Sequence, residues 1–276
     1  MLGQMQDYPL ALPHVFHRAE QIFGHKPITG VGAGGTVHRS DYASWAVRVR
    51  RAAAAIDALG VSPEGRVGTF CWNSPAHLEL YFAVPCSGRV LHTLNIRLFT
   101  EQLIYIANHA EDEVVFVDRS LFGQFWPHID EMTTVRKVIV IDDGADVAIP
   151  DDERISDYDA LLESVEPHEG RFEIADENQA AAMCYTSGTT GNPKGVVYSH
   201  RSTVLHSIAV LMADVAGLVE RDVLDAQPEG VGRHDAHRVQ PRRAVRVDDA
   251  LGVAGGAARV AHRGGRVLVR DGEVDR

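Results

Sequence analysis

One stretch of the sequence, TSGTTGNPKG at positions 186–195, combines the residue types that bind phosphate groups. Its glycines, Gly188, Gly191 and Gly195, let the backbone turn tightly and come close to a ligand. Successive backbone N–H groups in such a turn form a concave nest for anionic oxygens. The hydroxyl side chains add hydrogen-bond donors and oxygen ligands for Mg²⁺, and Lys194 adds a positive charge. The stretch therefore predicts a site for a polyphosphate.

The order of these residues differs from two common nucleotide-binding motifs. No G-x-x-x-x-G-K-[ST] sequence occurs here, because Lys194 stands between Pro193 and Gly195. No G-x-G-x-x-G sequence opens a helix at this place either. A polar hairpin turn that binds nothing is the alternative interpretation, and the full order of the ten residues favours the phosphate site.

The flanking segments must place this stretch at the edge of a sheet. The apolar run AAMCY precedes it and the run GVVYS follows it, so we expect a strand–loop–strand hairpin. Other runs are apolar throughout, as buried parallel strands are, and they alternate with helical patterns such as that of residues 41–59. Strands are predicted at 66–72, 113–118, 137–142 and 181–187. This alternation predicts an α/β fold with layered, mostly parallel sheets and flanking helices.

Polar residues mark where helices begin. Thr100 is predicted as the N-cap of one helix, and Ser74 starts another because a proline follows it. Ser156 and Asp159 have the spacing of a capping box before the sequence ALLES. The aromatic rings of Trp72, Trp126 and the phenylalanines are expected in the core.

Composition and charge exclude several classes of protein. The formal net charge of −11 argues against a nucleic-acid-binding protein. The sequence contains no run of 18 apolar residues, so no membrane span is predicted. The N-terminus lacks the basic start and apolar core of a secretory signal. Cys71, Cys86 and Cys184 are widely spaced and odd in number, so we expect buried thiols and no metal framework. These features predict a cytoplasmic protein.

The last part of the sequence uses a restricted alphabet. From Ala213 to Arg276 only Ala, Asp, Glu, Gly, Val, His, Leu, Pro, Gln and Arg occur, the residues encoded by codons that begin with G or C. Only three of the 27 basic residues are lysines, which indicates a GC-rich gene. In such a gene a shifted frame moves the G or C of third codon positions to first positions. We expect a frameshifted tail with its break between Ala213 and about Gln227, and a genuine Arg/Ala/Gly-rich disordered tail is the alternative.

The stretch YTSGTTGNPKGVVYSHRS at 185–202 resembles the phosphate-binding signature of the adenylate-forming (AMP-binding) superfamily. Three further stretches resemble its medium- and long-chain fatty-acid–CoA ligase branch. They are VVYSHRSTVLHSIA at 196–209, HTLNIRLFTEQLIYIANHAEDEVVFVD at 92–118 and CWNSPAHLELYFAVPCSG at 71–88. The resemblance runs from about Pro13 to Leu224 and stops where the composition changes.

The resemblance implies substrates and site residues. In this family a carboxylate attacks the α-phosphorus of ATP in the presence of Mg²⁺, and coenzyme A, as cosubstrate, then displaces AMP to give a thioester. By position, the loop would wrap the β- and γ-phosphates, Lys194 would close it, and Thr186 would be a ligand of Mg²⁺. The loop residues are Thr186, Ser187, Gly188, Thr189, Thr190 and Gly191. The implied partners are a fatty acid, ATP and coenzyme A, and a homodimer is expected because some relatives pair through their N-terminal regions.

The resemblance also implies elements that the sequence after Leu224 does not show. Full members carry there an acyl-pocket segment, a glutamate for Mg²⁺, an aspartate for the ribose and a small domain with a lysine, whereas no lysine follows Lys194. The expected organisation is a partial AMP-binding N-terminal domain over 1–224, a frameshifted and poorly ordered tail over 225–276, and no C-terminal small domain. No catalytic residue is assigned. A catalytically inactive remnant and a weak nucleotide-binding module stay open as alternatives to ligase activity.

Two residue pairs near the loop have ordinary interpretations. His200 and Arg201 are expected as solvated residues that begin a helix, with a contact from Arg201 to a phosphate as the alternative. Asn95 and Arg97 are expected to make a loop-stabilising hydrogen bond rather than to line the entrance to the site.

Overall fold

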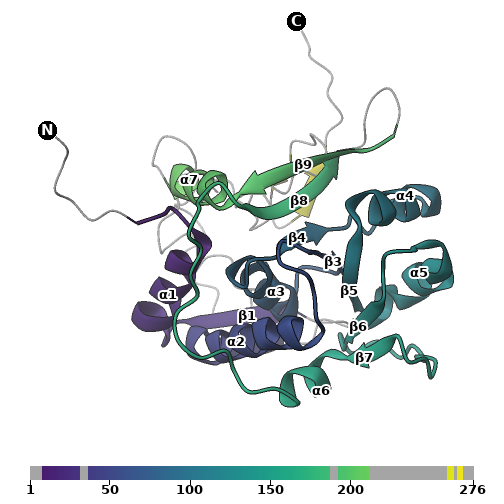
Figure 1. The fold of residues 1–276 in the computed structure, drawn as a ribbon, viewed down its shortest axis with the longest axis horizontal. Coiled ribbons are helices and arrows are strands. Elements are labelled where there is room, and N and C mark those ends of the chain that lie inside the picture. The colour runs from purple at the N-terminus through teal and green to yellow at the C-terminus, as the bar shows by residue number, and fades with distance from the viewer. Residues whose placement is uncertain (1–7, 32–36, 187–191, 212–259, 264–265, 270–276) are drawn as a thin grey trace, which may run out of the picture. The chain divides into compact units, whose positions relative to one another are not determined.

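The computed structural model describes residues 8–31, 37–186, 192–211, 260–263 and 266–269. The chain divides into two units, Met1–Val204 and Leu205–Arg276, which are described separately. The fold class predicted from the sequence is confirmed in the first unit, where a mostly parallel sheet is flanked by helices (Figure 1).

The sheet of the first unit has the strand order β7-β6-β5-β3-β4-β8-β9. All neighbouring pairs are parallel except β8 and β9, which form an antiparallel hairpin at one edge. The strands are β3 (Arg66–Phe70), β4 (Val90–Thr93), β5 (Asp112–Asp118), β6 (Lys137–Ile141), β7 (Ile155–Asp157), β8 (Ala180–Thr186) and β9 (Lys194–Ser199). The four strands predicted from apolar runs correspond to β3, β5, β6 and β8.

The central strands are apolar throughout because helices cover both faces of the sheet. In β5, Val114 and Phe116 pack into one hydrophobic cluster, whereas Val115 and Val117 pack into the other. This alternation follows from the two-residue period of a strand. The two clusters therefore account for the burial of the parallel strands.

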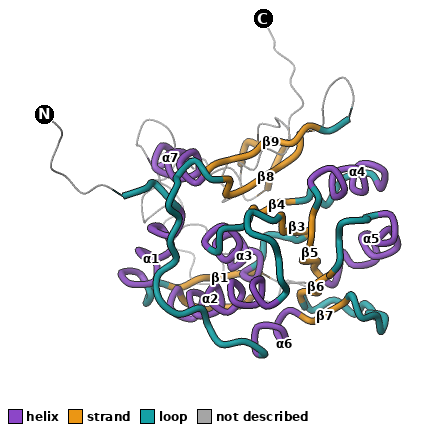
Figure 2. The backbone as a smooth tube through the Cα atoms, viewed as in Figure 1, coloured by secondary structure: helices purple, strands orange, loops and turns teal. Residues whose placement is uncertain are grey.

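The helices form one layer on each face (Figure 2). The first hydrophobic cluster draws on α1 (Leu12–Phe23), α2 (Tyr42–Ala58), α3 (Pro75–Cys86) and α6 (Tyr158–Glu163). The second draws on α4 (Thr100–Ala110), α5 (Phe122–Phe125) and the 3₁₀ turns Arg119–Leu121 and Trp126–Glu131. A further helix, α7 (His200–Leu211), follows β9.

Two antiparallel hairpins lie outside the main sheet, and neither was predicted from the sequence. In the first unit, β1 (Pro27–Val31) pairs with β2 (Val37–Asp41). In the second unit, β10 (Val260–Arg263) pairs with β11 (Arg266–Val269). The rest of the tail lies outside the described residues, so the expected poor order of that segment stays a prediction.

The predicted helix starts are partly confirmed. Ser74 caps α3 by accepting a hydrogen bond from the N–H group three residues later. The prediction for Thr100 was wrong by one position, because α4 begins at Thr100 itself and Phe99 occupies the N-cap. Asp157, not Ser156, caps α6, because the Asp157 side chain accepts a hydrogen bond from the N–H of Ala160. Both corrections are shifts of one residue at the end of an element.

The cysteine and membrane predictions concern the described residues. Cys71, Cys86 and Cys184 are buried free thiols, as expected. Within the described ranges, no helix is both long enough and apolar enough to span a bilayer.

Candidate functional site

The predicted strand–loop–strand hairpin is present. Strand β8 ends at Thr186 and β9 begins at Lys194, and these two residues are cross-strand partners. Strand β9 is the last strand of the sheet, so the hairpin lies at its edge, as predicted. Ser187, Gly188, Thr189, Thr190 and Gly191 lie outside the described residues, and their roles stay predictions.

Both ends of the loop are open to solvent. The side chains of Thr186 and Lys194 are exposed, and the Thr186 hydroxyl donates a hydrogen bond of 3.5 Å to the Lys194 carbonyl oxygen. No ion pair within the described part of the chain engages the Lys194 ammonium group. The ends of the hairpin therefore leave a hydroxyl and a positive charge accessible to a ligand.

The loop extends from the carboxyl end of β8, which runs parallel to β4. Ligands of open α/β sheets bind outside the carboxyl ends of the strands. The position of the hairpin is therefore one at which a ligand site is expected on the fold alone.

Gly195 has a role that the sequence did not reveal. It lies opposite Tyr185 in the hairpin, and a Cβ atom at Gly195 would stand only 3.1 Å from Cζ of Tyr185. The glycine thus makes room for the tyrosine ring to lie across β9. The sequence analysis assigned Gly195 to a tight turn of the backbone and to its close approach to a ligand.

Tyr185 joins the hairpin to the body of the first unit. Its hydroxyl shares a hydrogen bond of 2.6 Å with Nδ1 of His109 in α4. Its ring centroid lies 5.2 Å from that of His92 in β4. Nδ1 of His92 in turn lies 2.8 Å and 2.9 Å from the two carboxylate oxygens of Asp112. Sequence reasoning missed these residues, although a histidine in the run VLHTL was a visible polar interruption of a buried strand.

A second polar group lies where β3 and β5 end. The connection that leaves β3 leads to α3 on one face of the sheet, whereas the connection that leaves β5 leads to α5 on the other face. There the backbone N–H of Trp72 donates a 2.7 Å hydrogen bond to Asp118, and burial raises the pKa of that carboxyl to about 7. The indole N–H of Trp72 donates to the hydroxyl of Ser120 at 3.0 Å. The expectation that Trp72 lies in the core was wrong, because 49% of its surface is exposed, and the same expectation was wrong for Phe99, which is 75% exposed.

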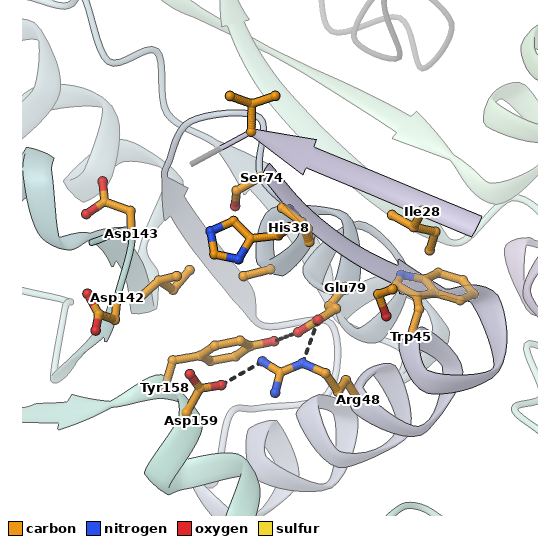
Figure 3. A pocket seen from close by; sticks show the side chains of 15 residues that line it. Ile28, His38, Trp45, Arg48, Ser74, Glu79, Asp142, Asp143, Tyr158 and Asp159 are labelled. Atoms are coloured by element: carbon orange, nitrogen blue, oxygen red, sulfur yellow. Dashed lines mark hydrogen bonds and ion pairs between the residues drawn. The ribbon is translucent and has the colours of Figure 1, made fainter. Parts of the chain in front are cut away.

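A cavity of about 320 Å³ lies elsewhere in the first unit (Figure 3). Glu79 on its wall accepts hydrogen bonds from Arg48 at 2.6 Å and from Tyr158 at 2.7 Å, and Arg48 also donates to Asp159. Burial raises the pKa of Glu79 although Arg48 stabilises its charge. Strand β6, which borders the cavity through Ile141, is four positions from β8 in the sheet, or about 19 Å. The cavity is therefore separate from the hairpin.

The residues that follow the hairpin differ in part from expectation. His200 is fully buried rather than solvated, and its Nδ1 accepts a 3.3 Å hydrogen bond from the backbone N–H of Leu12. Burial lowers the pKa of His200 to about 4. Arg201 is exposed, as expected, and pairs with Glu177. The loop-stabilising role of Asn95 is confirmed, since its side chain accepts a 3.0 Å hydrogen bond from the N–H of the second residue after it.

The predicted Mg²⁺ ligand is compatible with the geometry. Thr186 presents one exposed hydroxyl oxygen at the start of the loop. Mg²⁺ that accompanies a nucleotide keeps waters and takes oxygens from the phosphates, so it needs few protein ligands. Among the described residues, no group of three or more His, Cys, Asp or Glu side chains has the arrangement of a metal site. The assignment of Thr186 to Mg²⁺ therefore stays a prediction.

The fold is that of an α/β protein with an antiparallel hairpin at the edge of its sheet, and the ends of that hairpin, Thr186 and Lys194, are exposed. The sequence profile of the family described as "AMP-binding enzyme" matches residues 17–226. The chain belongs to this family.

Similar proteins of known activity are acid–CoA ligases. The chain is 41% identical over 224 residues to 3-methylmercaptopropionyl-CoA ligase of Ruegeria lacuscaerulensis. The aligned region covers 81% of this chain and 41% of that protein. It is 39% identical over 228 residues to medium-chain-fatty-acid–CoA ligase of Ectopseudomonas oleovorans, with coverage of 81% and 41%. It is 41% identical over 220 residues to long-chain-fatty-acid–CoA ligase of Thermus thermophilus, with coverage of 80% and 39%. The chain therefore spans about two fifths of the length of these relatives.

Solved structures show the same fold. An anthranilate CoA ligase in complex with anthranoyl-AMP superimposes with a TM-score of 0.63 at 18% identity and covers 74% of this chain and 38% of that structure. The fatty acyl CoA synthetase of Mycobacterium tuberculosis gives a TM-score of 0.55 at 21% identity, with coverage of 72% and 36%. The resemblance predicted from the sequence motifs is confirmed at the level of family and fold.

Proposed function

We propose that this sequence encodes part of an ATP-dependent acid–CoA ligase that activates a fatty acid. The carboxylate of the acid attacks the α-phosphorus of ATP and releases pyrophosphate, and the thiol of coenzyme A then displaces AMP from the acyl-adenylate. The observation that supports this most strongly is the exposed hairpin that carries TSGTTGNPKG at the carboxyl end of β8, in a chain that belongs to the AMP-binding enzyme family. The acyl group is proposed from the relatives named for fatty acids.

The residues of this chain act on the pyrophosphate end of ATP. The leaving pyrophosphate concentrates negative charge, so preorganised N–H groups, hydroxyls and a cation lower the barrier to its departure. We assign the exposed ammonium of Lys194 to the β- and γ-phosphates, together with the groups of residues 187–191. The exposed hydroxyl of Thr186 is assigned to Mg²⁺, which supplies charge neutralisation on the phosphate oxygens when bound.

A second candidate function is nucleotide binding without turnover. It is supported by the end of the family match at residue 226 and by the restricted alphabet from Ala213 onward. We propose that the partial domain ends near residue 224 and that the segment after it is read from a shifted frame. A homodimer and a cytoplasmic location stay predictions from the sequence.

Isotope exchange between pyrophosphate and ATP in the presence of a fatty acid distinguishes the two functions. Exchange above the background of a Lys194→Met variant would support ligase chemistry in this chain. Saturable binding of Mg·ATP without exchange would support the binding module. Absence of both would contradict the two functions together.

A further inference from the structure

We propose that Tyr185 is a positioning residue that holds both arms of the β8–β9 hairpin and thereby sets the relative position of Thr186 and Lys194, the two ends of the phosphate loop. The inference rests on the proposed binding of a polyphosphate by that loop. Tyr185 is the residue of β8 immediately before Thr186, so any movement of its backbone is transmitted directly to the first residue of the loop.

The ring of Tyr185 holds the second arm of the hairpin. The ring lies across β9 at Gly195, where a Cβ atom would be only 3.1–3.4 Å from three atoms of the tyrosine ring and hydroxyl. Gly195 directly follows Lys194, the residue that closes the loop. One side chain on β8 therefore contacts the arm that carries the loop's cation.

The hydroxyl of Tyr185 holds the first arm against α4. It lies 2.6 Å from Nδ1 of His109, and the two rings meet edge to face with centroids 5.7 Å apart. Burial raises the pKa of Tyr185 to about 12, so the hydroxyl keeps its proton at neutral pH and can donate it to a neutral imidazole. His109 is exposed and lies in the last turn of α4, so it belongs to a different element from either arm.

A buried pair of side chains supports the ring from β4 and β5. His92 packs against the ring of Tyr185, and both oxygens of the Asp112 carboxylate contact Nδ1 of His92. The side chains of His92 and Asp112 are fully buried. Breaking such a pair leaves a buried polar group without its partner, which is costly, so the position of the His92 ring is well determined. Tyr185 thus rests on a rigid part of the sheet while it contacts both arms.

The contacts act together on the separation of the loop ends. Thr186 and Lys194 are cross-strand partners only in the observed register of the hairpin. Without the link to α4 and the ring over Gly195, the two arms of an edge hairpin can twist apart. The Thr186 hydroxyl and the Lys194 ammonium would then no longer be held in the arrangement that one anion requires.

The test compares Tyr185→Phe with Tyr198→Phe in the full chain. Both variants lose one tyrosine hydroxyl from the same hairpin, but within the described residues the hydroxyl of Tyr198 makes only a long hydrogen bond of 3.8 Å, which it accepts from Sγ of Cys184. We expect Tyr185→Phe to weaken Mg·ATP binding about three- to tenfold in calorimetric titration, the effect of one typical hydrogen bond. Tyr198→Phe should bind ATP like the unaltered chain.

Substitutions of His109 test the partner of the hydroxyl. His109→Gln retains a side-chain acceptor and should bind ATP as the unaltered chain does, whereas His109→Leu should weaken binding like Tyr185→Phe. Hydrogen–deuterium exchange of peptides from residues 180–199, measured without nucleotide, gives an independent readout. Tyr185→Phe and His109→Leu should accelerate exchange there and leave peptides from β5 and β6 unchanged.

The two readouts separate this inference from the proposed function. If the unaltered chain fails to bind ATP but Tyr185→Phe selectively accelerates exchange in the hairpin, the proposed function fails and the structural role of Tyr185 stands. Equal exchange and equal ATP affinity in Tyr185→Phe and Tyr198→Phe would overturn the inference. If His109→Gln binds ATP as weakly as His109→Leu does, the role of the hydrogen bond is overturned.

Discussion

Lys194 is the described residue whose chemistry is most specific to a polyphosphate. Its side chain is exposed next to the loop and is not engaged in an ion pair within the described part of the chain. A compact ammonium group interacts with phosphate oxygens as a point charge. The Lys194 ammonium can therefore bind a ligand without first breaking an ion pair.

Lys194→Met should weaken Mg·ATP binding about 10- to 100-fold, the range of a lost charge-assisted hydrogen bond. Lys137→Met is the matched control. The Lys137 ammonium donates a hydrogen bond to the carbonyl oxygen of Glu153, near the edge of the sheet opposite the β8–β9 hairpin. Isothermal titration of ATP into both variants measures the difference. Equal affinity in the two variants would exclude Lys194 from the site.

His200 makes the stability of the chain depend on pH. Its pKa is lowered from 6.5 to about 4 in the folded state by burial, so between these values the unfolded chain binds a proton that the folded chain does not. Stability from this group is present above pH 6.5 and is lost as the pH falls toward 4, by no more than about 3 kcal/mol.

His200→Asn should reduce this loss, since an asparagine oxygen can accept the hydrogen bond from the N–H of Leu12 but does not titrate. Urea denaturation at pH 7 and pH 5 gives the free energy of unfolding of both proteins. We expect the unaltered chain to lose more stability than the variant between the two pH values. An equal loss would mean that His200 titrates normally.

At the scale of elements, the β1–β2 hairpin is fitted closely against the start of α3. A Cβ atom at Gly30 would lie 2.4 Å from Cγ and 2.6 Å from Cδ of Pro75. These are atoms of a closed ring at the first turn of a helix, so they cannot rotate away. The contact between the hairpin and α3 therefore requires glycine at this position.

Gly30→Ala should lower the free energy of unfolding by about 1–3 kcal/mol, as overpacking of a close contact does. Gly123→Ala is the matched control, because Gly123 lies in α5 with nothing within 4 Å of an added Cβ. There alanine should be neutral or stabilising by up to about 1 kcal/mol. Urea denaturation of both variants measures the effect, and similar stabilities would show that the hairpin does not pack as described.

The elements that sequence analysis identified are those with a continuous apolar pattern. Strands β3, β5 and β6 are buried on both faces and β8 is partly buried, and all four are rich in apolar residues, so their composition alone indicates them. Strands β1 and β2 are largely exposed and contain polar residues and glycine, and β7 has only three residues, so no period was visible in them. Strand β4 was missed because His92 interrupts its apolar run, and its burial depends on the distant Asp112.

The candidate site was predictable only to the extent that it is contiguous in the sequence. The hairpin and its exposed ends followed from the run of residues around 186–195. The support for Tyr185 comes from His92 in β4, His109 in α4 and Asp112 in β5, which the fold brings together from far along the chain. No local pattern encodes such contacts.

At the scale of the whole molecule, two features of the sequence change within one short stretch of the chain. The family match ends at residue 226, and the restricted alphabet begins at Ala213. Sequencing the DNA across codons 213–227 and translating the other frames should yield aromatic and acidic residues that continue the family sequence. Recovery of the same restricted alphabet in an intact frame would contradict the proposed frameshift.

Mapping of Mg·ATP by hydrogen–deuterium exchange tests most directly whether the loop holds the triphosphate. The full chain is titrated with Mg·ATP, and peptides that cover residues 185–195 are compared with those from β6, α3 and α6 around the cavity of Figure 3. We predict saturable protection of the 185–195 peptides that Lys194→Met weakens. The absence of saturable protection there, or protection confined to the cavity, would contradict the assignment of the nucleotide to the β8–β9 hairpin.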